Sequence, residues 1–263
     1  MRIRALLTKE FLDLARNRAA LIPVVIMMLV SLTMPFFVLL ILPAITGRSI
    51  ETDRALSQVS MVADPNGVLT EANRVVFFLF QQFLILFLLT PVVGAMSLAS
   101  HAVVGEKQNR TLEPLLATPM TTIELLVAKV LGALLPALGI SYAGLVLYFG
   151  GVWLFEPAAI FRMLMTARTF ALVLVDGPIA ALVSLQAAIV ISSRVNDPRT
   201  AQQFGALIVV PLTMVFIGQL TGSLWLSAPM LVLTGLALAI VWGLLLLFTV
   251  ALFERESILT RWR

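Results

Sequence analysis

The sequence contains no cysteine, a single histidine and few charged residues. Asp, Glu, Lys and Arg together make up 12% of the 263 residues, which is about half the share in a typical globular protein. The absence of cysteine excludes disulfides, thiolate metal sites and thiol catalysis. The histidine, His101, has no second ligand nearby, so no metal site is predicted. H-E-x-x-H, G-x-S-x-G and phosphate-loop motifs are all absent, and the sequence therefore does not indicate an enzyme.

Long uncharged stretches are what the sequence does contain, since 60% of its residues are hydrophobic. A helix needs about 20 apolar residues to cross a bilayer. The stretch 200–253 carries no charge, but as one helix it would be about 81 Å long, which is too long for one crossing. The glycines, serines and proline of 218–229 mark its break. We therefore predict an all-α integral membrane protein, a single transmembrane domain over 1–263 with six spans at about 20–45, 75–100, 124–151, 169–193, 202–218 and 230–253.

The basic residues are distributed unevenly between the two sets of connecting segments. Most of the Lys and Arg residues fall in the set 1–18, 101–129, 194–199 and 254–263, whereas the other set holds only Arg48, Arg54, Arg74, Arg162 and Arg168. Basic segments stay in the cytoplasm. The pattern predicts a multi-pass protein of the cell (inner or plasma) membrane with both termini cytoplasmic. Because membrane topology accounts for the basic residues, no nucleic-acid partner is predicted.

The N-terminal segment has the spacing of an amphipathic helix. Ile3, Leu7, Phe11 and Leu14 recur at steps of three or four, and charged residues fall between them. This pattern is typical of a helix that lies flat at the membrane surface. We predict an interfacial helix over 3–16, before the first span.

Asp176 is the one carboxylate at membrane depth. A carboxylate there is costly, so it should face the bundle or a watery cavity and have a partner. Gln81, Gln82 and Gln186 are the candidate partners. Two interpretations stay open for these four residues: a place on a substrate path, or polar contacts between helices.

The segment between the second and third predicted spans carries the most specific motif. It reads Gly-Glu-Lys-Gln-Asn-Arg-Thr-Leu-Glu-Pro-Leu-Leu-Ala-Thr-Pro over 105–119, and Ile-Glu-Leu-Leu-Val-Ala-Lys follows over 123–129. This motif resembles the E-K-(x)n-G/R-T-L-E-x-L-L-x-T-P signature of ABC type-2 transporter permease subunits. Pro114 departs from that signature. The loop at 192–203 also resembles the second cytoplasmic loop of one branch of the family.

The resemblance implies a function. The chain would be the membrane subunit of an ATP-driven exporter, forming the substrate path as a dimer with a second copy or a paralogue. ATP and Mg²⁺ would be bound by separate ATPase subunits, and this chain would carry no cofactor. A coupling helix within 104–118 would contact the ATPase through Glu106, Lys107, Arg110, Thr111, Leu112, Glu113, Leu115 and Leu116.

Two other functions are compatible with a polytopic membrane protein. An ion-coupled secondary transporter needs ionisable groups or broken helices at the midplane, and only Asp176 offers such a group. A polytopic membrane enzyme needs a catalytic constellation at one membrane face, and the sequence shows none. Co-purification of an ATPase distinguishes the exporter from both.

Overall fold

A computed structural model describes residues 7–9, 11–14, 17–47, 49–50, 53–64, 67–108, 122–195 and 197–252. These residues form helices and connecting turns, with no strand among them, so the all-helical prediction is confirmed for this part of the chain. The first half comprises α2 (Arg18–Phe36), the π-helical turn η1 (Phe37–Ile41), α3 (Leu42–Thr46), α4 (Arg54–Ser60) and α5 (Glu71–Gln108). The second half comprises α7 (Thr122–Phe155), α8 (Ala158–Leu164), α9 (Ala167–Ala171), the π-helical turn η3 (Leu172–Asp176), α10 (Gly177–Arg194), α11 (Pro198–Leu220) and α12 (Ala228–Leu252).

Side-chain caps fix where several helices begin. The side-chain oxygen of Asn17 accepts a hydrogen bond from the N–H of Ala20 at 3.2 Å before α2. The carboxylate of Asp197 accepts one from the N–H of Thr200 at 3.1 Å before α11. Pro198 follows it at the first helical turn, where its missing N–H leaves no hydrogen bond unmade. Such caps satisfy backbone groups that a helix end leaves free.

Five helical segments are long and apolar enough to cross a bilayer: Arg18–Thr46, Glu71–Gly105, Leu126–Phe155, Ala167–Ser193 and Ala228–Val250. The predicted fifth span, 202–218, lies within α11, whose described apolar part, Val209–Leu220, is shorter than a span requires. The count of six therefore stays a prediction. The uncharged stretch 200–253 is interrupted between Leu220 and Ala228, where Gly222 adopts a positive φ of 72°.

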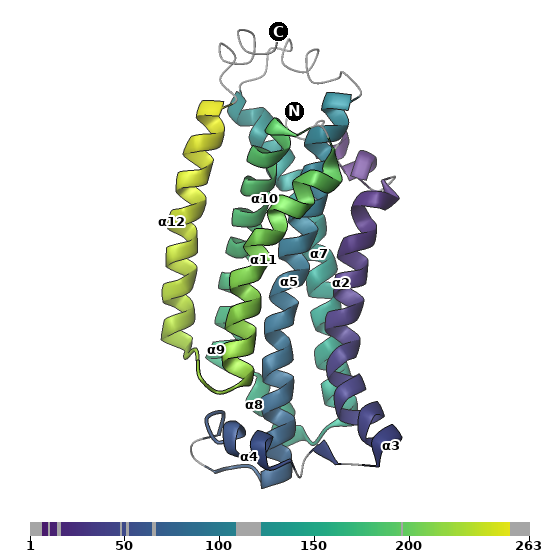
Figure 1. The fold of residues 1–263 in the computed structure, drawn as a ribbon, viewed down its shortest axis with the longest axis vertical. Helices are drawn as coiled ribbons and strands as arrows, with labels where there is room; N and C mark the ends of the chain where they lie inside the picture. Colours follow the sequence, from purple (N-terminus) through teal and green to yellow (C-terminus); the bar gives the residue numbers. More distant parts are fainter. Residues whose placement is uncertain are drawn as a thin grey trace.

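α5 lies at the centre of the bundle (Figure 1), where it packs against α2, α7, α10 and α11. Its most apolar stretch is 89% buried, compared with 17% for the first span and 11% for α12. Serine hydroxyls join the central helices: Ser97 donates to the carbonyl of Ala20 at 2.9 Å, and Ser184 to the carbonyl of Val92 at 3.0 Å. Small polar contacts of this kind let helices approach closely in a membrane.

The two ends of the bundle differ (Figure 1). α3, α4, α8 and the turn between α11 and α12 lie at one end, which we call the α4 end. α2 begins and α12 ends at the opposite end, and so do the helix ends that flank residues 109–121. Of the predicted interfacial helix 3–16, residues 7–9 and 11–14 are helical, and the others lie outside the described residues. Leu14 is buried, whereas Phe11 is exposed.

Candidate functional site

The predicted ATPase-contact segment is only partly described. Glu106 and Lys107 lie in the last turn of α5, which continues to Gln108. The helix thus passes the predicted end of the second span at residue 100 and includes the start of the 104–118 segment. The remaining predicted contact residues, Arg110, Thr111, Leu112, Glu113, Leu115 and Leu116, lie outside the described residues.

Asp176 lies at the end of η3 and is 4% exposed. Its Oδ1 lies 3.3 Å from the hydroxyl oxygen of Thr234 on α12, and its Oδ2 is buried without a hydrogen-bond partner among the described residues. The close approach depends on Gly235. A Cβ there would lie 2.8 Å from a methyl carbon of Val175 and 3.1 Å from Asp176 Oδ1. A glycine thus lets α12 seal this carboxyl inside the protein.

Asp176 forms no hydrogen bond with the three glutamines predicted as its candidate partners. Gln82 on α5 donates through Nε2 to the backbone carbonyl of Gln219 on α11 at 3.4 Å. Gln81 and Gln186 are buried, and both side-chain polar atoms of Gln186 have no partner among the described residues. Asp176 is within hydrogen-bond distance of Thr234 instead, because α12 contacts this turn more extensively than α5 does. In the sequence, the adjacent Thr234 and Gly235 correspond to this contact, but α12 also carries Gly243 and Thr249, so spacing alone does not single them out.

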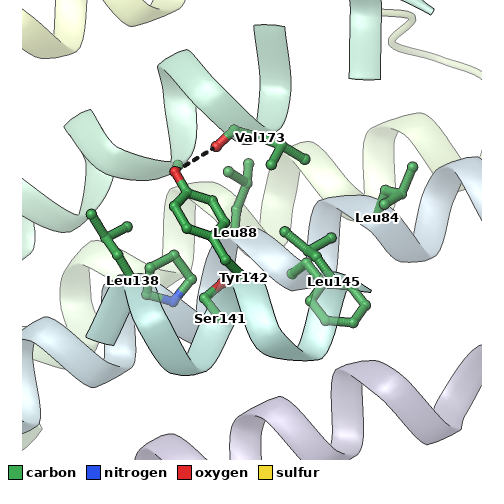
Figure 2. A pocket seen from close by; sticks show the side chains of 10 residues that line it. Leu84, Leu88, Leu138, Ser141, Tyr142, Leu145 and Val173 are labelled. Carbon is green, nitrogen blue, oxygen red and sulfur yellow. Dashed lines mark hydrogen bonds between the residues drawn. The ribbon is translucent and has the colours of Figure 1, made fainter. Parts of the chain in front are cut away.

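The π-helical turn η3, which ends at Asp176, has a local cause. The N–H of Gly177 bonds to the carbonyl of Leu172, five residues back. In that register the carbonyl of Val173 would accept from residue 178, but Pro178 has no N–H. The hydroxyl of Tyr142 on α7 donates to this carbonyl instead, at 3.4 Å (Figure 2). A neighbouring helix thus supplies the donor that proline removed.

A small cavity of about 10 Å³ lies beside this contact, between α5, α7 and the turn (Figure 2). That volume matches about one water-sized probe, so this conformation has no room here for a substrate. The lining is mainly aliphatic and aromatic, with the hydroxyl groups of Ser141 and Tyr142 among it. The cavity is therefore too small to be a substrate chamber.

A polar cluster closes the α4 end, and sequence reasoning did not find it. We call it the Arg168 cluster. Arg168 on α9 donates through Nε to the carbonyl of Leu226 at 2.8 Å and through Nη2 to the side-chain oxygen of Gln219 at 2.6 Å. Its guanidinium carbon lies 4.0 Å from the centre of the Trp225 ring, a distance typical of a cation–π contact. In the sequence, Arg168 is counted only among the charges that flank spans.

The Arg168 cluster also reaches the central helix. The Trp225 ring stacks on Phe78 of α5, with ring centres 6.4 Å apart and planes inclined by 17°. Gln82, through its bond to the Gln219 carbonyl, is the second contact from α5. The cluster thus comprises Arg168, Gln219, Trp225, Leu226, Phe78 and Gln82. No carboxylate among the described residues forms an ion pair with Arg168.

Comparison with known proteins agrees with the motif at 105–129. The family model described as ABC-2 family transporter protein matches residues 4–253. No curated protein and no solved structure gives a significant match. The family match covers nearly the whole chain, including all the helices described above. The chain therefore belongs to the ABC-2 transporter family and is a multi-pass membrane transport component.

Proposed function

We propose that this chain is the permease subunit of an ATP-driven exporter and works with separate ATPase subunits. The observation that carries the proposal is the family match over residues 4–253. The sequence contains no phosphate-binding loop, so ATP and Mg²⁺ would be bound on a partner chain. Hydrolysis there would drive export through the membrane domain.

The proposed topology has six crossings, with α11 as the fifth. α11 runs alongside α5 in Figure 1 and contacts it, and the ends flanking residues 109–121 lie opposite the α4 end. The excess of Lys and Arg in that segment and its counterparts supports a cytoplasmic position for them. The α4 end then faces outward in the cell membrane, and both termini are cytoplasmic.

The proposed transporter is a dimer of this chain or of this chain and a paralogue. The dimer is proposed because the peripheral helices have a large apolar surface. Only 17% of the most apolar stretch of the first span and 11% of that of α12 are buried. Lipid covers part of such a surface. A second copy would cover the rest and enclose the substrate path.

The proposed coupling segment is 106–116. Charges on an exposed loop contribute little to stability individually, whereas at an interface they determine partner choice and register. Leu112, Leu115 and Leu116 would be the apolar anchors in a groove of the ATPase. In this arrangement the segment transmits ATP hydrolysis to the spans through its junctions with α5 and α7.

The test is a pull-down of the ATPase, combined with transport in vesicles. Glu113→Lys should leave membrane insertion and thermal stability unchanged but reduce ATPase binding at least ten-fold and abolish ATP-dependent transport. Arg162→Glu is the control, because Arg162 is an exposed residue on α8 at the α4 end, beyond the reach of a cytoplasmic partner. Normal binding and transport by Glu113→Lys would show that the segment only connects two helices and does not couple the permease to the ATPase. Export that persists without any ATPase would instead support an ion-coupled carrier.

A further inference from the structure

We infer that Arg168 is a positioning residue that keeps the outer end of the transporter closed by pinning the turn 221–227 between α11 and α12. The inference rests on the proposed function, because it assigns the α4 end to the outside of an exporter. An exporter must open this end to release substrate and close it again. Arg168 would act on that step through the turn, without contacting the substrate.

The contacts that hold the turn come from three separate elements. Arg168 of α9 bonds to Gln219, which lies on α11 just before the turn, and to Leu226 within the turn. α5 contributes the stacking of Phe78 on Trp225 and the Gln82 bond. α4 contributes Val59, whose side chain lies against Gly222. A movement of the turn would break all these contacts together, as expected of an element with two discrete positions.

The closed arrangement leaves several polar groups unsatisfied. Arg168 Nη1, Gln219 Nε2 and Gln82 Oε1 are buried without a hydrogen-bond partner among the described residues. Burying such groups costs free energy, and native structures keep few of them without a reason. If the turn moves outward, water reaches these atoms and the cost disappears. The closed state therefore combines strong local contacts with a penalty that opening relieves, so hydration of these atoms would offset part of the free energy lost when the contacts break.

The neighbouring packing permits the movement. α12, which follows the turn, is only 11% buried over its most apolar stretch, and it packs mainly against α10, η3 and α9 and not against the central helix α5. Beneath the turn, Val75, Phe78 and Leu79 of α5 form a buried apolar cluster against which Trp225 and Leu220 pack. Opening the turn would expose this cluster at the outer face. Val75, which is fully buried, therefore provides a position at which opening can be measured.

The absence of natural cysteine makes a reversible lock possible. An ideal Cβ at position 222 lies 3.7 Å from the Cβ of Val59, within the range found in disulfides. The double variant Val59→Cys/Gly222→Cys should transport in reductant, lose at least ten-fold of its transport when oxidised, and recover when reduced again. Because Gly222 has a positive φ, the reduced double variant is the reference for folding. Unchanged transport by fully cross-linked protein would overturn the inference.

A second measurement tests Arg168 itself and requires no ATPase. In the Val75→Cys background, a membrane-impermeant maleimide should label the cysteine at least ten-fold faster after Arg168→Gln. Arg168→Lys should lie between, since it keeps the charge but has fewer donors. Arg162→Gln is the control, because the Arg162 Nε bonds only to a carbonyl of its own helix in the described structure. Equal labelling rates in Arg168→Gln and wild type would show that Arg168 does not hold the turn.

The two tests separate this inference from the proposed function. If Arg168→Gln is labelled fast but the protein binds no ATPase, the role of Arg168 in closure is supported and the exporter assignment is contradicted. If the oxidised Val59→Cys/Gly222→Cys protein still binds the ATPase and transports substrate, the exporter assignment is supported and the role of Arg168 in closure is contradicted.

Discussion

Thr234 has one hydroxyl proton and two oxygen atoms within reach. Its oxygen lies 2.7 Å from the carbonyl of Leu231 and 3.3 Å from Asp176 Oδ1. The carbonyl is the closer acceptor, and a hydroxyl donates only once. The contact with Asp176 is then made best by a protonated carboxyl that donates to the threonine oxygen. A neutral side chain also avoids the cost of an unpaired carboxylate at membrane depth.

This arrangement predicts that Asp176 does not need its charge. Asp176→Asn keeps a donor toward Thr234, so transport should remain above half of the wild-type rate, and stability should change by less than about 1 kcal/mol. Thr234→Val, which leaves the carboxyl without its partner, should cost about 1 kcal/mol. The measurements are transport in vesicles, normalised to folded protein, and unfolding in detergent. A folded Asp176→Asn protein that cannot transport would show that the charge itself handles an ion or a cationic substrate.

The hydroxyl of Tyr142 substitutes for the N–H that Pro178 lacks, so the two residues should be coupled energetically. Tyr142→Phe should destabilise the protein by about 1 kcal/mol, because the Val173 carbonyl loses its donor. In a Pro178→Ala background the alanine N–H becomes available to that carbonyl, and the cost of Tyr142→Phe should disappear. A double-mutant cycle on unfolding free energies measures this coupling.

The second tyrosine of α7 provides the matched control for this cycle. Tyr148 donates to the carbonyl of Phe80 at 2.6 Å in a buried site less than two turns further along the helix, and it does not contact the Val173 carbonyl. Its replacement by phenylalanine should cost the same whether residue 178 is proline or alanine. If Pro178→Ala changed the cost of both tyrosine variants equally, the effect would come from the whole bundle and not from this carbonyl.

At the scale of elements, the two π-helical turns among the described residues, η1 and η3, stand directly before an X-Pro pair. η1 is followed by Leu42-Pro43 and η3 by Gly177-Pro178, and in each the N–H of X bonds five residues back. A proline ring clashes with the carbonyl four residues before it in a regular helix. The wider turn relieves that clash and leaves a local irregularity, a feature that often accompanies a hinge or a functional site. At η3 this irregularity is contacted by side chains of two other helices, Tyr142 of α7 and Thr234 of α12.

The packing of α12 against η3 should depend on one glycine. Gly235→Ala places a methyl group against Val175 and Asp176, so it should destabilise the protein by about 1–3 kcal/mol. Gly243→Ala, on the same helix, meets no atom within 4 Å and should stabilise the protein by about 0.5–1 kcal/mol through helix propensity. Thermal unfolding of both variants beside wild type gives the comparison. Equal shifts in the two variants would mean that α12 is not held at Gly235.

The long helices were predictable because membrane insertion depends on the local run of apolar residues and not on contacts with distant parts of the chain. A run of apolar residues between charges enters the membrane whatever its neighbours are, so Val75 and Ser100 mark where the second apolar run begins and ends. α5 continues beyond this apolar run to Gln108. Its last turn can carry charged residues because a helix that has left the bilayer needs no apolar surface. The break near Gly222 was readable from turn chemistry alone.

The polar contacts were not predictable in the same way. The partner of Asp176 depends on which helix covers η3, and that choice follows from a glycine contact that spacing does not reveal. Arg168 resembles any arginine at the edge of a span until Gln219, Trp225 and Leu226 are brought beside it by folding. The motif at 105–119 gives a more specific prediction, an ATPase-contact segment, but most of its residues lie outside the described part of the chain, so its role stays a prediction.

At the scale of the whole molecule, burial decreases from the centre to the periphery. α5 is enclosed by other helices, whereas many large apolar side chains of α2 and α12 are exposed, such as Ile26, Leu236 and Leu247. In water these surfaces would aggregate, but in a bilayer they face acyl chains at little cost. Stability within this chain therefore depends mainly on the contacts around α5. The peripheral helices remain available for lipid and for a second copy.

The orientation of this bundle can be tested through its natural glycosylation sequon, Asn109-Arg110-Thr111. The distribution of basic residues predicts a cytoplasmic position for this segment, so the protein made in glycosylating microsomes should carry no glycan there. Val68→Thr creates a second sequon, with Asn66 as its acceptor, at the α4 end, where Val68 is 72% exposed. That variant should gain a glycan, seen as a mass shift that a glycosidase removes. A glycan on Asn109 in the wild-type protein would invert the topology, place the α4 end in the cytoplasm, and remove the basis for assigning the Arg168 cluster to the outer face.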